Sequence, residues 1–149
     1  MPIITPAAML REEEDAPGGT IIAQWISEPG GLSQFGALIQ TIPPGAATSR
    51  NHWHAHEDEM VLLLEGNLLL HEGGVVTPMQ PGDAATFPAG VAVGHHLQNA
   101  SDAPARLLVV GTRAPTDIIH YTEDGRRCVR VRALPDDLWI DATGEPIKP

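Results

Sequence analysis

The distribution of glycine and proline constrains the fold of this chain most strongly. Fifteen glycines and fourteen prolines are spread over 149 residues. Turn-forming residues therefore recur roughly every eight to twelve positions, which is typical of short strands joined by turns. This spacing favours many strands over long helices, so the sequence predicts an all-β fold.

Short helical structure is predicted near the N-terminus alone. Thr5 can act as an N-cap with Pro6 at the first helical position, and the helical pattern runs to Glu14. Acidic residues at the C-terminal end of such a helix oppose its dipole, so one or two turns are expected. A turn is expected at 29–31. Strand-like segments lie at 20–27, 35–42, 60–64, 68–71, 75–77, 84–87, 95–98, 106–110 and, less regularly, 118–131.

Length and charge indicate the general class of protein. A chain of 149 residues predicts one domain that buries a core without disulfides. The single cysteine, Cys128, excludes an internal disulfide and fits a reducing compartment. A net charge of −10 opposes binding to nucleic acid or to anionic membranes. No signal peptide or membrane span is recognised, so a cytoplasmic protein is expected.

Two histidines separated by one residue form the most informative motif. Successive side chains of a strand alternate faces, so His52 and His54 point to the same side. Glu59 has the opposite parity and can join them only if 55–58 form a turn and Glu59 opens the next, antiparallel strand. Two imidazoles and a carboxylate suit a first-row transition metal. The motif predicts a metal pocket without indicating a reaction.

Two separated motifs resemble those of the cupin superfamily. The first is a glycine, His-x-His, a glutamate and a glycine, matched by Gly45, His52, His54, Glu59 and Gly66. The second is a glycine, Pro-x-Gly, a histidine and an asparagine, matched by Gly82, Pro88, Gly90, His95 and Asn99. The short spacer between the motifs is similar to that of small single-domain bacterial cupins.

The resemblance implies a double-stranded β-helix, or jelly-roll, barrel. It implies a single cupin domain over 1–149, with its motif core at 35–112 and a C-terminal extension at 113–149 packed on the barrel. The implied metal ligands are His52, His54, Glu59 and His95. These ligands leave one or two positions for water or substrate around a divalent Fe, Mn, Zn, Ni, Co or Cu ion.

The second motif departs from the family pattern and leaves one alternative open. Four residues separate Gly90 from the histidine, where two are usual. Counting back from Asn99 selects His95 as the ligand. If the insertion instead follows the histidine, His96 takes its place. One extra residue before His52 is interpreted as a longer loop.

The other candidate residues receive structural interpretations. His56 is expected to be exposed or just behind the site, and Glu57 and Asp58 to lie in a turn at the surface. Trp53 is expected to pack between the sheets. His71 and His120 are interpreted as isolated, structural residues, Cys128 as unreactive, and the cluster at 126–132 as a solvated strand edge. Phe87, Met60 and Leu97 are expected in the core.

The apolar run at 60–64 predicts a strand that is buried on both faces. In a two-sheet sandwich the outer face of a strand usually meets solvent, so the apolar outer face of this strand must be covered by another part of the protein. The N-terminal strands or a second subunit could do so, and we expect a homodimer.

Two functional hypotheses follow. The first is a metal-dependent enzyme that acts on a small organic molecule, of dioxygenase, isomerase or lyase type. The alternative is a non-catalytic cupin that binds a small ligand or acts as a sensor. The acidic chain offers no helix-turn-helix, which argues against direct transcriptional control.

Overall fold

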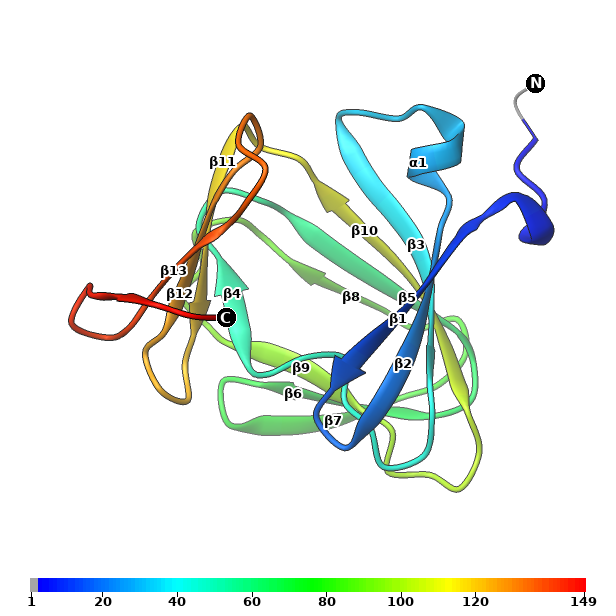
Figure 1. Ribbon diagram of the computed structural model, residues 1–149. Coiled ribbons are helices and arrows are strands. Elements are labelled where there is room, and N and C mark those ends of the chain that lie inside the picture. Colours follow the sequence, from blue (N-terminus) through cyan, green and yellow to red (C-terminus); the bar gives the residue numbers. More distant parts are fainter. Residues whose placement is uncertain (1–2) are drawn as a thin grey trace.

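Two antiparallel sheets face each other in the computed structural model, which describes residues 3–149 (Figure 1). Residues 1 and 2 lie outside the described residues. They belong to the predicted domain at 1–149 and to the N-terminal segment in which no signal peptide is recognised. The strand order is β1-β2-β3-β10-β5-β8 in the six-stranded sheet and β14-β13-β12-β11-β4-β9-β6-β7 in the eight-stranded sheet. This arrangement confirms the predicted all-β jelly roll.

The strands are β1 (Leu10–Ala16), β2 (Gly19–Trp25), β3 (Phe35–Ile42), β4 (His52–His54), β5 (Glu59–Glu65), β6 (Leu68–Glu72), β7 (Val75–Met79), β8 (Ala84–Phe87), β9 (His95–Gln98), β10 (Ala105–Thr112), β11 (Thr116–Tyr121), β12 (Arg127–Val131), β13 (Leu138–Ile140) and β14 (Pro146–Ile147). The helical elements are the 3-10 turn η1 (Pro6–Ala8) and α1 (Ser27–Gly30). Within residues 3–149, no helix has the length and apolar character needed to cross a membrane.

The N-terminal helix ends earlier than predicted. Helical structure stops at Ala8, and the segment from Leu10 to Glu14 belongs to β1, which pairs with β2. The prediction of a helix to Glu14 was wrong because hairpin pairing with the next strand outweighs local helix propensity. The turn predicted near Pro29 is instead part of α1.

The core lies between the two sheets. It is built from the inward positions of both, and its largest fully buried apolar side chains are Ile21, Ile42, Val61, Leu63, Leu68, Leu97 and Leu107. Gly66 closes the turn after β5 at a φ of +84°, and a Cβ there would lie 2.8 Å from the Pro104 carbonyl oxygen. The first motif therefore needs glycine at this position.

Strand β5 is buried on one face and partly exposed on the other. Val61 and Leu63 are 1% and 0% exposed, whereas Met60 and Leu64 are each 37% exposed. Strands β1 and β2 extend the sheet beyond β3 and do not cover the outer face of β5. The prediction of a strand buried on both faces is therefore wrong within one chain.

The segment after Thr112 extends the eight-stranded sheet. Strand β11 pairs with β4, β12 pairs with β11, and β13 and β14 follow outward. These strands form the yellow-to-red wall at the left of Figure 1. The C-terminal segment thus lies directly beside the strand that carries His52 and His54.

Candidate metal centre

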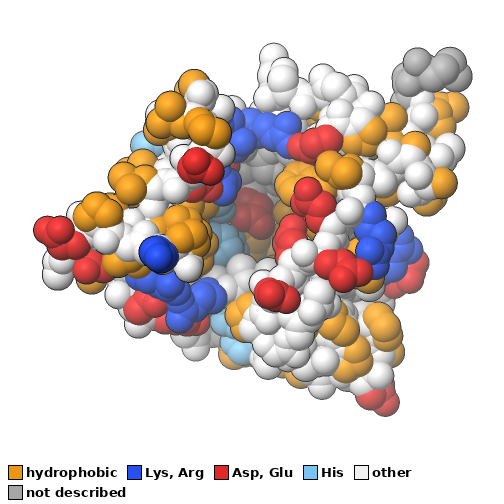
Figure 2. Space-filling model, viewed as in Figure 1, with side chains coloured by type: hydrophobic (Ala, Val, Ile, Leu, Met, Phe, Trp, Pro, Cys, Tyr) orange, Lys and Arg blue, Asp and Glu red, His pale blue; other side chains and the backbone are white. Residues whose placement is uncertain are grey.

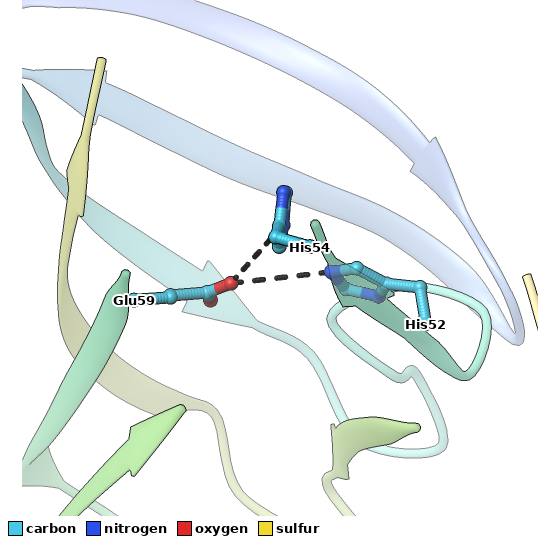
Figure 3. Close-up of side chains that lie close together, drawn as sticks. All are labelled: His52, His54 and Glu59. Carbon is cyan, nitrogen blue, oxygen red and sulfur yellow. Dashed lines mark ion pairs between the residues drawn. The ribbon is translucent and has the colours of Figure 1, made fainter. Parts of the chain in front are cut away.

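The structure brings His52, His54, Glu59 and His95 together between the sheets. His52 and His95 are opposite each other on β4 and β9, and Glu59 is the first residue of β5, in the other sheet. The Glu59 Oε2 atom lies 3.9, 3.5 and 3.6 Å from the Nε2 atoms of His52, His54 and His95, respectively. Figure 3 shows two of these contacts. Glu59 opens the strand after the turn, as predicted from its parity.

The spacing of these donor atoms suits one metal ion. Two ligand atoms that each lie about 2.1 Å from an ion are about 3.0 to 3.4 Å apart. The ligand atoms of His52, His54 and Glu59 all lie within 4.8 Å of one another. Small shifts would bring them to coordination distance, and the nitrogen and oxygen donor set suits a first-row divalent metal.

His95 offers the clearest sign that a cation fits here. Its side chain is buried, and neither ring nitrogen has a hydrogen-bond partner among the described residues. The Phe87 ring lies parallel to the imidazole, with 3.5 Å between centroids, and fixes its plane. An unpartnered buried polar group is costly. Coordination of a cation would supply the missing partner.

The neighbouring His96 lies on the other face of β9. Its ring stacks on His71, with 4.5 Å between centroids, and the His71 Nε2 atom lies 3.1 Å from the Gln98 side-chain oxygen. The structure therefore brings His95, and not His96, to the cluster. His71 is not isolated, because cross-strand pairing places it opposite His96, but it packs away from the cluster, in agreement with its interpretation as a structural residue.

Hydrogen bonds behind two of the histidines fix their orientation. His54 Nδ1 lies 2.6 Å from Asp117 Oδ2, and His52 Nδ1 lies 2.9 Å from the Arg50 carbonyl oxygen. A ring that donates from Nδ1 keeps Nε2 free for a metal. Asp117 is fully buried, and its second oxygen accepts the His56 backbone N–H at 2.9 Å.

Asp117 was not predicted as part of the site. It lies outside both motifs, and its contact with His54 depends on the pairing of β11 with β4. Ligand atoms of His54, Glu57 and Asp117 also form a compact group. Since His54 and Asp117 already satisfy each other within this group, we interpret it as an orienting contact behind the cluster.

The local electrostatics favour a cation. Burial lowers the pKa of His52 to about 4, so its ring is neutral at pH 7. Burial also opposes the charged form of His54, but hydrogen bonds to Asp117 and Glu59 raise its pKa to about 9. Burial also opposes the charged form of Glu59, but its contacts with the three histidines of the cluster outweigh burial and hold the pKa of Glu59 well below its usual range. The cluster thus combines a carboxylate with positive charge that a metal ion can replace.

The cluster opens into a cavity of about 230 Å³ between the sheets. Trp25, Leu38 and Val109 form an apolar wall on the side of the six-stranded sheet, and His54 and Glu59 line its floor. Figure 2 shows the hollow, with acidic and histidine side chains inside it and basic side chains along its upper edge. A small polar molecule could reach the cluster through this opening.

Sequence reasoning missed charged residues around the cavity. Glu57, predicted at the surface, is 6% exposed. Its Oε1 atom accepts hydrogen bonds from Arg132 Nη2 at 2.5 Å and from the Ala114 N–H at 3.0 Å. Arg130 and Arg132 line the cavity. The prediction of a solvated edge was wrong because β12 lies between β11 and β13.

The structure also tests the positions expected for Trp53, His120, His56 and Cys128. Trp53 points away from His52 and His54 but stacks on His120, with 3.9 Å between centroids, so it does not pack between the sheets and His120 is not isolated. His56 is exposed, as expected. Cys128 is buried, and burial raises the pKa of its thiol to about 12, as suits an unreactive thiol.

Sequence and structure together define the family. Residues 38–111 match the family model described as "Cupin domain". The chain is 33% identical to a protein from Silicibacter pomeroyi DSS-3, with 99% of this chain and 97% of that chain covered and a TM-score of 0.89. The chain belongs to the cupin superfamily.

Individual relatives point to several small-molecule activities. The Silicibacter pomeroyi protein is described as a sugar phosphate isomerase. A putative sugar phosphate isomerase from Acidithiobacillus ferrooxidans ATCC 23270 is 24% identical over 99% of this chain and 96% of that chain, with a TM-score of 0.85. The polyketide cyclase RemF from Streptomyces resistomycificus is 25% identical over 75% and 79%, with a TM-score of 0.63. No curated protein matches the chain.

Proposed function

We propose that this protein is a metal-dependent isomerase of a small phosphorylated sugar, with His52, His54, Glu59 and His95 as metal ligands. The observation that carries the proposal is the convergence of three imidazoles on one carboxylate oxygen at the floor of a cavity. The whole-chain similarity to the Silicibacter pomeroyi sugar phosphate isomerase supports this substrate class. Dioxygenase and lyase chemistry have no comparable whole-chain support.

The residues of the site would divide the work between binding and orientation. A divalent metal held there would polarise the carbonyl group of a bound sugar. Asp117 would hold the His54 ring in position, and Phe87 would do the same for His95. Trp25, Leu38 and Val109 would shield one side of the substrate from water. An aldose–ketose isomerisation moves a hydrogen from C2 to C1 and a proton from the C2 hydroxyl oxygen to the C1 oxygen, and it needs no co-reactant.

The test combines metal analysis with an isomerase assay. The purified protein should contain close to one equivalent of a divalent transition metal and should interconvert an aldose phosphate and its ketose isomer, followed by proton NMR. His52→Ala should lose both properties. His56→Ala is the matched control, because that histidine is exposed and lies outside the cluster. Saturable sugar phosphate binding without conversion would instead support the non-catalytic alternative.

The homodimer also stays a prediction, and we propose the outer face of the six-stranded sheet as its contact. Phe35, Met60 and Leu64 are 39%, 37% and 37% exposed on the outer face of the six-stranded sheet. A second copy of the chain would remove this apolar surface from water. Sedimentation velocity should therefore detect a dimer. A cytoplasmic location is likewise retained as a prediction.

A further inference from the structure

Three arginines line the cavity that holds the candidate metal centre. Arg113 follows β10, Arg130 lies in β12, and Arg132 follows β12 directly. Their side chains are 18%, 33% and 33% exposed. They are therefore partly withdrawn from water, in the same cavity whose lining includes His54 and Glu59.

Strand pairing places two of these arginines on the same face as His54. His54 lies opposite Ile119 on β11, and Ile119 lies opposite Cys128 on β12. Cross-strand partners share a face of the sheet, and so do residues two positions apart. Arg130 and Arg132 follow Cys128 at such positions. Their side chains therefore project from the inner face, in line with the cluster.

Each arginine is held by a carboxylate that leaves part of its guanidinium available. The pairs are Arg113 with Glu28, Arg130 with Asp137 at 2.8 Å, and Arg132 with Glu57 at 2.5 Å. A guanidinium carries five N–H donors in a rigid fork, so one carboxylate does not exhaust them. A second anion can therefore bind to side chains that are already ordered, which lowers the entropic cost of binding.

The arginines are the cationic groups of the cavity lining. Each is already paired with a carboxylate, and Asp58 and Glu59 also line the cavity. A phosphate monoester, which carries a charge of about −1.5 to −2 at neutral pH, would therefore bind through the remaining guanidinium N–H donors and not through an excess of positive charge.

We propose that Arg113, Arg130 and Arg132 form a subsite for the phosphate group of the substrate, at the open side of the cavity. This inference rests on the proposed function, because it assigns the residues that would distinguish a phosphorylated sugar from a neutral one. The arginines anchor the phosphate, and the sugar carbon atoms extend from there toward the histidine cluster. Guanidinium groups bind phosphate oxygens well because two parallel N–H donors can engage them at once.

The experiment measures binding of inorganic phosphate to the full-length protein after its metal has been removed by chelation. Phosphate cannot bind to a metal ion under this condition, so the arginines are tested alone. Isothermal titration calorimetry should detect saturable binding. Arg130→Gln and Arg132→Gln should each weaken it by about tenfold or more, since hydrogen bonds to charged groups contribute strongly. Absence of saturable binding, or unchanged binding in both variants, would overturn the subsite.

Matched variants separate a local effect from a folding defect. Arg106→Gln is the control, because Arg106 also pairs with a carboxylate, Glu65, but lies near the opposite end of β10. It should bind phosphate as the wild type does. Arg130→Lys keeps the charge but loses the fork and should restore part of the binding. Equal losses in Arg106→Gln and Arg130→Gln would show that the effect is not local and would contradict the proposal.

The metal-loaded protein distinguishes failure of the subsite from failure of the proposed function. Ribose 5-phosphate and ribose serve as a matched pair of probes for binding. If the subsite is correct, the wild type should prefer the phosphorylated sugar and Arg132→Gln should lose that preference. Retained isomerase activity with no preference would reject the subsite alone. If the protein shows no isomerase activity but its phosphate binding still depends on the arginines, the proposed function is rejected and the anion subsite is retained.

Discussion

The floor and the rim of the cavity come from different parts of the chain and have different chemistry. His54 and Glu59 on the floor lie within the segment that matches the family model, as do His52 and His95 beside them in the cluster. The rim arginines lie beyond it, after Thr112. His95 has no hydrogen-bond partner for its ring nitrogens among the described residues, whereas each rim arginine is paired with a carboxylate. The shared core thus supplies donors suited to a cation, and the extension supplies donors already ordered for an anion.

The largest expected effect tests the floor. Glu59→Gln removes the carboxylate whose Oε2 atom faces all three imidazoles. We expect its metal affinity to fall by more than the roughly 10- to 100-fold typical of residues behind the ligands. A competition titration against a chelator measures this loss. Asp58→Asn is the neighbouring control, and a wild-type affinity in Glu59→Gln would refute the assignment.

A smaller effect tests whether floor and rim are separable. Asp117 belongs to the extension but contacts His54 on the floor. Asp117→Asn should lower metal affinity about 10- to 100-fold, because the ring loses the charged partner that orients it. Asp137→Asn, next to Arg130, should leave metal affinity unchanged. The same chelator competition measures both variants, and equal losses would contradict the division into floor and rim.

A substitution on the other face of β9 should spare the floor. His96→Ala removes a ring that stacks on His71, so the free energy of unfolding should fall by about 0.5–1.5 kcal/mol. Metal affinity should stay at the wild-type value. Chemical denaturation and metal titration measure the two effects. The reverse pattern, with metal lost in His96→Ala and kept in His95→Ala, would exchange the roles of the two histidines.

The smallest effect concerns Cys128, which lies in β12 two residues before Arg130. Burial raises the pKa of its thiol from an ordinary 9.0 to about 12. The neutral thiol therefore contributes stability below pH 9, and this contribution is lost as the pH rises toward 12. At pH 8 the folded protein should react with iodoacetamide far more slowly than the protein unfolded in guanidinium, as mass spectrometry can measure. Equal rates would contradict the burial of this thiol.

The parts of the fold that neighbouring residues determine could be predicted from the sequence. Glycine and proline mark the turns, and the segment predicted as a strand at 35–42 is β3. The parity of Glu59 relative to His54 correctly required a turn followed by a new strand. These features depend on neighbouring residues, so one sequence was enough to find them.

The features that were missed depend on pairing between segments. Leu10–Glu14 has helical composition, and only its ladder with the next strand, β2, makes it a strand. Glu57 appears in a polar turn, yet contacts from Arg132 and the Ala114 N–H bury it. Asp117 lies in no motif. For Glu57 and Asp117 the partners lie far along the chain, so no local pattern indicates these contacts.

The β11–β12 hairpin carries both a residue behind the histidine cluster and an arginine that lines the cavity. Asp117, behind His54, lies directly opposite Arg130 on the rim. A chain that stopped at Thr112 would keep every motif by which a cupin is recognised, yet it would lose both of these groups. The proposed metal centre and the proposed phosphate subsite therefore both depend on residues of this hairpin, outside the segment that matches the family model.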